Sequence, residues 1–154
     1  MKILAIRLKN LASLAGPFEI DFTAEPLASA GLFAITGPTG AGKSTLLDAL
    51  CLALFGTVPR LGDTGQAKMP DADTDISIGD PRTLIRRGTG GGYAEVDFVG
   101  VSGRRYRARW EANRARDKAS GKLQNSRQSL IDLDSEQLLD SQKTEYKTQR
   151  ELAL

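Results

Sequence analysis

The chain has 154 residues, of which 40% are hydrophobic and 26% are charged, and its formal net charge is +2. This length is typical of one domain with a buried core, and no apolar run approaches the roughly 18–20 residues that span a bilayer. Histidine is absent and Cys51 is the only cysteine, which excludes an internal disulfide, a cysteine zinc site and a Ser-His or Cys-His nucleophile pair. Arg7 interrupts the apolar start of the chain, so we expect no signal peptide and a soluble protein of a reducing compartment.

Charge is distributed unevenly along the chain. Residues 82–127 carry 12 basic and 4 acidic side chains, a net charge of +8, whereas the segments before and after them each carry −3. A surface that binds a polyanion requires a basic block of this kind. A solvated surface with internal ion pairs would give the same composition, so both interpretations remain open at this point.

The first third of the chain predicts strands followed by a helix. Residues 2–9, which alternate apolar and polar side chains from Ile6 to Lys9, and residues 18–22, which alternate throughout, predict two strands paired as a hairpin. Residues 32–36 form a short continuous apolar run, typical of a strand buried on both faces at the centre of an α/β sheet. After a glycine-rich turn, residues 43–55 predict a mostly buried helix that ends at Gly56.

Residues 57–82 contain three prolines and several glycines, so we expect a long surface loop, with disorder as an alternative. Aspartates at positions 71, 73 and 75 alternate as in a calcium-binding loop. Such a loop needs glycine and glutamate at its sixth and twelfth positions, where this chain has Ile76 and Arg82. We therefore expect a solvated acidic loop.

Two further strands are expected over residues 93–100 and 104–111, joined by a loop at 101–103 in which Gly103 is left-handed. Their apolar side chains fix the register, because they must share one face of the sheet. That face consists of Ala94, Val96, Phe98, Tyr106, Ala108 and Trp110.

This register places Asp97 opposite Arg107 and Glu95 opposite Arg109 on the other face. We favour cross-strand ion pairs for these two arginines. The alternative is that they track a phosphate backbone together with Arg105, since the three arginines alternate along one strand face.

The remaining residues are interpreted from their composition. Residues 113–126 are polar and basic and predict a loop, 128–133 predict a strand, and 135–154 are helical in composition. The last residues contain no capping glycine or terminating proline, so we expect a helix that continues beyond Leu154.

Residues 37–44, GPTGAGKS, match the phosphate-binding loop pattern G-x-x-x-x-G-K-[ST] between a predicted strand and a predicted helix. Glycines let the backbone wrap around an anion, and the helix start adds unsatisfied N–H groups and the positive end of its dipole. Lys43 would contact the β- and γ-phosphates of ATP, Ser44 would bind Mg²⁺, and Thr45 would reach the α-phosphate side. The expected nucleotide-binding residues are Gly37, Pro38, Thr39, Gly40, Ala41, Gly42, Lys43, Ser44 and Thr45.

Hydrolysis normally needs a second acidic site, in which an apolar strand ends in Asp and a neighbouring group positions water. Residues 130–136 place acids after apolar residues, including Asp134, but Asp132 interrupts the short run. We interpret this segment as a polar strand edge. We therefore expect ATP–Mg²⁺ binding and no catalytic residue in this chain.

Several stretches resemble a known family. KILAIRLKNLASLAGPFEIDF at 2–22 leads into GLFAITGPTGAGKSTLLDAL at 31–50, and YAEVDF at 93–98, YRARW at 106–110 and NRAR at 113–116 extend the similarity. They resemble the N-terminus of SbcC proteins, the ATPase subunits of bacterial SbcCD nucleases within the SMC-like group of ATP-binding-cassette ATPases. The resemblance covers essentially the whole chain.

The resemblance implies an α/β fold in which residues 1–154 form an N-terminal ATPase lobe, with antiparallel strands beside the strand–loop–helix unit. Family members are far longer, and two ATPase lobes flank a coiled coil. The implied partners are an SbcD-like manganese-dependent nuclease, double-stranded DNA ends, the C-terminal lobe of the same protein and a second head in an ATP-dependent dimer. The implied role is ATP control of an exonuclease and endonuclease in DNA repair and recombination, in the bacterial cytoplasm at the nucleoid and away from membranes.

Other single residues have expected roles. Trp110 and Cys51 are expected in the core, and Asp48 is expected to be a structural residue of the helix and not a metal ligand. Basic side chains with few acidic neighbours in sequence are candidates for contacts with the DNA backbone. These are Arg104, Arg114, Arg116, Lys118 and Lys122.

Two other classes remain open. A nucleotide-binding module of another ATPase of this type would share the phosphate loop; it could be SMC-like, RecF-like, RecN-like or half of a transporter. The transporter form would lack DNA affinity and would stack adenine on an aromatic residue ahead of the loop. A non-catalytic interaction fragment would show no stabilisation by ATP.

Overall fold

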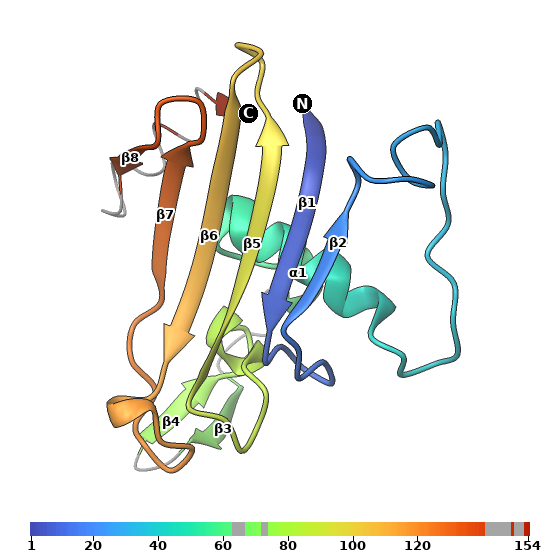
Figure 1. The fold of residues 1–154 in the computed structure, drawn as a ribbon. Helices are drawn as coiled ribbons and strands as arrows, with labels where there is room; N and C mark the ends of the chain where they lie inside the picture. The colour runs from blue at the N-terminus through green and yellow to red at the C-terminus, as the bar shows by residue number, and fades with distance from the viewer. Residues whose placement is uncertain (63–66, 72–73, 141–148, 150–152) are drawn as a thin grey trace.

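The computed structural model describes residues 1–62, 67–71, 74–140, 149 and 153–154. Its main element is a six-stranded antiparallel sheet in the order β2-β1-β5-β6-β7-β8 (Figure 1). These strands are β1 (Lys2–Lys9), β2 (Phe18–Asp21), β5 (Gly91–Val99), β6 (Arg105–Asn113), β7 (Arg127–Asp132) and β8 (Gln137–Asp140). The smaller elements are the hairpin β3 (Lys68–Asp71) and β4 (Thr74–Ser77) and the 3-10 turns Pro59–Leu61, Pro81–Leu84 and Ala115–Asp117.

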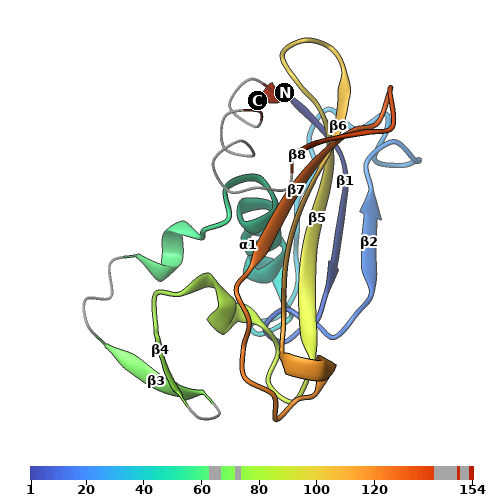
Figure 2. The ribbon, with the colours of Figure 1, turned by 90° about the vertical axis from the view of Figure 1, so that its left-hand side faces the viewer.

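Helix α1 (Lys43–Phe55) packs across one face of the sheet, and the core lies between them (Figure 2). Trp110 and Phe98 from the sheet and Leu52 from the helix are fully buried there. The helix ends at Gly56, which adopts the left-handed conformation of a C-terminal cap and donates its N–H to the carbonyl of Leu52 at 2.8 Å. The expected helix bounds and the core position of Trp110 are confirmed. Among the described residues, no helix combines the length and apolar character needed to cross a membrane.

The register of the central hairpin is the predicted one. Strand β5 pairs with β6 so that Asp97 lies opposite Arg107 and Glu95 opposite Arg109. The turn closes with a hydrogen bond from the Gly100 N–H to the Arg104 carbonyl at 2.9 Å, and Gly103 has φ +79°. The pairing of β1 with β2 and the strand at β7 are confirmed as well.

The strand expected over residues 32–36 is wrong. These residues are irregular, and their apolar side chains face solvent: Leu32 is 93% exposed, Phe33 47% and Ile35 44%. A strand buried on both faces needs a neighbouring strand on each side to pair its backbone. The sheets of the described residues contain no strand that pairs with this run.

Two other expectations are corrected. The segment 57–82 is not a plain loop, because Met69 of β3 and Ile76 of β4 pair across a short hairpin; residues 63–66 and 72–73 lie outside the described part of the chain. The prediction of a helix over residues 135–154 is wrong for the first of these residues. The Asp132 carboxylate accepts the N–H groups of residues 134 and 135 and reverses the chain into strand β8. Most of the remaining helix prediction falls on residues outside the described ones.

The sheet face opposite α1 carries interleaved arginines and carboxylates. Asp97 is at the centre of this network, with its side chain 9% exposed. It accepts hydrogen bonds from Arg107 Nε at 2.7 Å and from Arg7 Nη1 at 2.9 Å. Arg109 Nη1 bonds Glu95 at 3.0 Å. The predicted ion pairs of Arg107 and Arg109 are therefore confirmed, and Arg7 joins them.

Burial alone would raise the pKa of Asp97, but hydrogen bonds from Arg107 and Arg7 and their positive charges outweigh it and hold the pKa below its ordinary value. The stabilisation from this carboxylate is therefore complete above the unfolded pKa of about 4 and is lost as the pH falls through the folded pKa.

Replacing Asp97 by Asn should lower the free energy of unfolding at pH 7 by about 3 kcal/mol, the low end for a buried ion pair, because both arginines are partly exposed. Urea denaturation at pH 7 and at pH 3 measures this difference, which should shrink at the lower pH. Asp134→Asn is the matched control, since it breaks an exposed pair with Arg105 and should have a smaller effect. Equal stability of wild type and Asp97→Asn at pH 7 would contradict this role of Asp97.

Candidate nucleotide site

The phosphate-loop sequence forms an exposed turn that leads directly into α1. All three of its glycines have positive φ, at +153° for Gly37, +84° for Gly40 and +90° for Gly42. Residues that carry a side chain are strained at positive φ, so these positions favour glycine. The turn also contains a hydrogen bond from the Ala41 N–H to the Pro38 carbonyl at 3.2 Å. The loop conformation thus depends on the glycine pattern seen in the sequence.

The N-terminus of α1 carries an uncompensated positive end. Gly42 is its N-cap and offers no side chain to the N–H groups of the first turn, and no acidic residue occupies that turn. The unsatisfied N–H groups and the helix dipole therefore favour a bound anion at this end.

Lys43 lies back over the loop. Its Nζ donates to the carbonyl of Gly37 at 2.7 Å and to that of Pro38 at 2.8 Å. The ammonium is thereby held against the loop that precedes the helix, where it adds a full positive charge beside the N–H groups. Such a constellation suits a phosphate chain.

The next two residues point in different directions. Ser44 is exposed, so its hydroxyl is available to a metal ion held by a bound phosphate, whereas Thr45 is 6% exposed and packs inward. One turn further, Asp48 is buried and accepts two hydrogen bonds from Arg60 Nε at 2.7 and 2.8 Å. Asp48 is thus engaged in a structural ion pair within the helix region. Within the described ranges, no group of three His, Cys, Asp or Glu side chains could hold a metal ion.

Cys51 is half-buried against the core, in part as expected. Burial, with a further contribution from the charge of Asp48, raises the pKa of its thiol. The side chain therefore stays neutral at physiological pH and has a packing role.

The two acids considered as a second catalytic motif are both engaged elsewhere. Asp132 is buried and bonded to Arg104 at 2.6 Å. Asp134 accepts from the backbone N–H and from Nε of Arg105, at 2.8 and 2.7 Å. They shape the β7–β8 turn, in agreement with the interpretation as a polar strand edge.

The candidate DNA contacts fall into two groups. Arg104 is paired with Asp132, and Arg114 with Asp71 at 2.6 Å with only 12% of its side chain exposed. These two arginines have few acidic neighbours in sequence, but the fold pairs each with an aspartate that lies far away along the chain. Among the described residues, the other three candidates are exposed and take part in no ion pair. These are Arg116, Lys118 and Lys122.

One contact of the loop was not foreseen. Leu14, from the segment between β1 and β2, packs against Gly42; a Cβ atom placed on Gly42 would lie 2.6 Å from Leu14 Cδ2. The apolar pattern of residues 11–14 signals burial but not the partner, because the left-handed Ala12 that shapes this turn leaves no mark on the sequence.

Comparison with known proteins connects this geometry to a family. A family model described as an AAA domain matches residues 5–153. The SbcC subunit of the nuclease SbcCD from Pseudomonas aeruginosa is 66% identical over 156 residues, which cover 100% of this chain and 13% of the relative. The protein of the same name in Rhodobacter capsulatus is 56% identical over 144 residues, 92% of this chain and 12% of the relative.

A more distant relative is the probable DNA double-strand break repair Rad50 ATPase of Aquifex aeolicus, which is 44% identical over 62 residues, 40% of this chain and 6% of that protein. The chain thus spans about an eighth of the length of the first relatives. With a glycine-rich loop at the start of α1 and a match to nearly all of its residues, the chain belongs to the AAA domain family of nucleotide-binding ATPases and resembles, over its whole length, the N-terminal region of the SbcC subunit of SbcCD nucleases.

Proposed function

We propose that residues 1–154 form the N-terminal ATP–Mg²⁺-binding lobe of an SbcC-like ATPase. The observation that carries this proposal is the GPTGAGKS loop at the uncapped start of α1, with the Lys43 ammonium held against it. In the longer protein, ATP would join two such heads and control an SbcD-like nuclease that acts on DNA ends and hairpins in the bacterial cytoplasm. Similarity to proteins named as the SbcC subunit of SbcCD nucleases favours this role over a transporter ATPase.

The residues of the phosphate loop would have different roles in binding ATP and Mg²⁺. The N–H groups of Gly40, Gly42 and Lys43 would surround the phosphates, and the Lys43 ammonium would leave its carbonyl partners for the β- and γ-phosphates. Ser44 would supply one oxygen ligand to Mg²⁺, and the bound ion would neutralise part of the phosphate charge. Thr45 is buried, so its contribution to the α-phosphate side would come through its backbone N–H.

The exposed run at 32–36 supports a second lobe as partner. Its exposed apolar residues directly precede the phosphate loop in the sequence, and Leu47 of α1 is also 58% exposed. The C-terminal lobe of the same protein would supply the strands that pair with this run and remove these side chains from water.

For DNA, the available charges are at one end of the sheet. The loop 114–122 follows β6 at its Asn113 end and carries the exposed Arg116, Lys118 and Lys122. The sheet face itself is neutralised by its own carboxylates. DNA contacts are therefore proposed for this loop and would be made to phosphates, without reading the base sequence.

Mg-ATP should stabilise the wild-type chain, by about 2.7 kcal/mol at a ligand concentration 100 times Kd. Lys43→Ala should lose most of this stabilisation because the phosphates lose their cation, while the unliganded fold stays intact. Thermal shift and equilibrium binding measure both quantities. Lys68→Ala, which removes an exposed lysine of β3, is the control and should bind as wild type does. Equal affinity of Lys43→Ala and wild type would overturn the site.

The chain alone should release no phosphate from ATP above the level of Lys43→Ala. The acids that could have held Mg²⁺ or positioned water, Asp132 and Asp134, are bonded to arginines at the β7–β8 turn. A phosphate-release assay under saturating Mg-ATP tests this expectation. Steady release that Lys43→Ala abolishes would show that a catalytic group had been overlooked.

Binding of a duplex of arbitrary sequence should be weak and salt-dependent. Lys118→Ala with Lys122→Ala should flatten the slope of log K against log salt by about 1.8 units, because each lost phosphate contact contributes about 0.9. The control of equal charge is Lys2→Ala with Arg105→Ala, at the opposite end of the sheet, and should leave the slope unchanged. Fluorescence anisotropy measures both variants; equal slopes for them would contradict the assignment to the loop.

A further inference from the structure

The segment that joins β1 to β2 contains two strained residues. Asn10 has φ +53° and Ala12 has φ +46°, in the left-handed region that side chains rarely adopt. Asparagine tolerates this region, whereas alanine does so only when the surroundings fix it. The contacts of residues 10–15, called here the β1–β2 turn, must therefore hold it in place.

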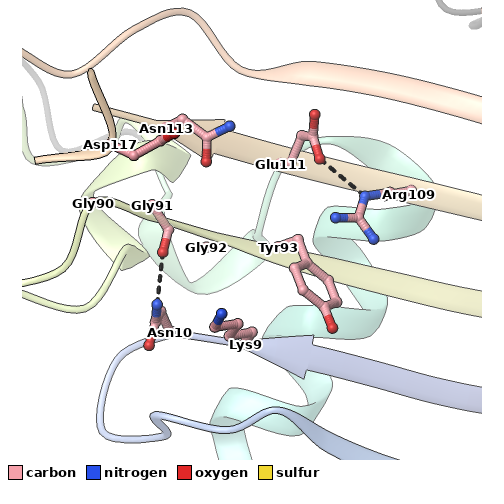
Figure 3. A pocket seen from close by; sticks show the side chains of 10 residues that line it. All are labelled: Lys9, Asn10, Gly90, Gly91, Gly92, Tyr93, Arg109, Glu111, Asn113 and Asp117. Atoms are coloured by element: carbon pink, nitrogen blue, oxygen red, sulfur yellow. Dashed lines mark hydrogen bonds and ion pairs between the residues drawn. The ribbon is translucent and has the colours of Figure 1, made fainter. Parts of the chain in front are cut away.

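On one side, backbone groups of residues 84–91 hold the turn. The Ala12 N–H donates to the Leu84 carbonyl at 2.7 Å, and the Arg86 N–H donates to the Asn10 carbonyl at 2.9 Å. The Asn10 side chain donates to the Gly91 carbonyl at 2.8 Å, as Figure 3 shows. These bonds fix the two ends of the strained stretch to a segment more than 70 residues away in the sequence.

The side chain of Arg86 adds the contacts nearest the tip. Its Nη1 donates to the Ser13 carbonyl at 2.6 Å and to the Ala12 carbonyl at 3.3 Å. Hydrogen bonds from a charged donor are stronger than neutral ones. Within the part of the chain that the structure describes, Arg86 forms no ion pair, so these carbonyls are its partners. Arg87, the next residue, is exposed.

On its other side the turn contacts the phosphate loop. Leu14 follows Ser13 directly, and its side chain fills the space next to Gly42, where even one added carbon would lie 2.6 Å away. Gly42 has φ +90° and precedes Lys43, so its conformation sets the direction in which the helix begins. Arg86 is therefore connected to the phosphate loop by a short series of contacts. Its guanidinium holds the carbonyls of the turn, and Leu14 of the turn packs against Gly42 of the loop.

We propose that Arg86 is a positioning residue for the phosphate loop. It holds the β1–β2 turn so that Leu14 supports Gly42 in the conformation that directs the first N–H groups of α1 at the phosphates. The inference rests on the proposed nucleotide site, and it assigns to Arg86 an effect on ligand affinity in the folded chain, in addition to an effect on stability.

Arg86→Ala should weaken Mg-ATP binding between about 2- and 30-fold, the range typical of residues that act on a site through others. Arg87→Ala removes the same charge one residue along and should bind within twofold of wild type. Titrations with a fluorescent ATP analogue at 10 °C, with the native fold checked by circular dichroism, separate affinity from stability. A purely structural arginine would lower the melting temperature and leave the affinity of the folded chain unchanged.

Leu14→Ala tests the same path without touching Arg86. If Arg86 acts through Leu14, the double variant should lose no more affinity than the weaker-binding single variant, because the second change removes nothing further. Losses that multiply in the double variant would overturn the path. If Arg86→Ala does not fold, Leu14→Ala decides alone: affinity equal to wild type would overturn the inference.

Lys43→Ala in the same titration distinguishes a failure of the Arg86 role from a failure of the nucleotide site. If the wild type binds Mg-ATP, Lys43→Ala does not, and Arg86→Ala binds as the wild type does, then the role of Arg86 is wrong and the nucleotide site is supported. Absence of Mg-ATP binding by the folded wild type would overturn both.

Discussion

The pairing of β5 with β6 organises the rest of this structure. Because side chains alternate across a strand, one register decides the content of both sheet faces at once. It places Trp110 and Phe98 against α1, where they are fully buried, and Arg107 and Asp97 on the opposite face. A slip by one residue would expose the tryptophan and bury the arginine, so the core and the ion-pair network enforce the same register.

This register also determines where positive charge remains available. The segment 82–127 has a net charge of +8, yet its strand arginines are neutralised by carboxylates on β5 and β6 and by Asp134 beyond β7. Among the described residues, the exposed cations of this segment that form no ion pair are on the loop that leaves β6, around Lys118 and Lys122, and at Arg87 and Arg127. Net charge along a sequence is therefore a poor guide to a polyanion surface until cross-strand partners have been assigned.

The sequence patterns predicted the features that depend on near neighbours. Helix α1, the β5–β6 register and the phosphate loop follow from periodicity, from glycine positions and from one short motif, all of which act over a few residues. Contacts between distant segments could not be derived in this way. The pairs Arg114–Asp71 and Arg104–Asp132 and the packing of Leu14 on Gly42 arise only when the folded chain brings these segments together. The strand prediction for residues 32–36 was wrong for a related reason. The composition of this run favours a central strand, but a strand forms only beside its hydrogen-bonding partners.

That exposed run has a consequence for the energetics of the site. It enters the phosphate loop at Gly37, whose carbonyl holds the Lys43 ammonium, so any surface that pairs with residues 32–36 also restricts the front half of the loop. If covering of the run or binding of the phosphates restricts the loop, the event that follows has less conformational entropy to lose. Covering of the run and binding of the phosphates would then be thermodynamically linked, and each would raise the affinity of the other by the same factor. A segment that lies outside the sheet of this chain would thereby couple assembly with the proposed second lobe to nucleotide occupancy.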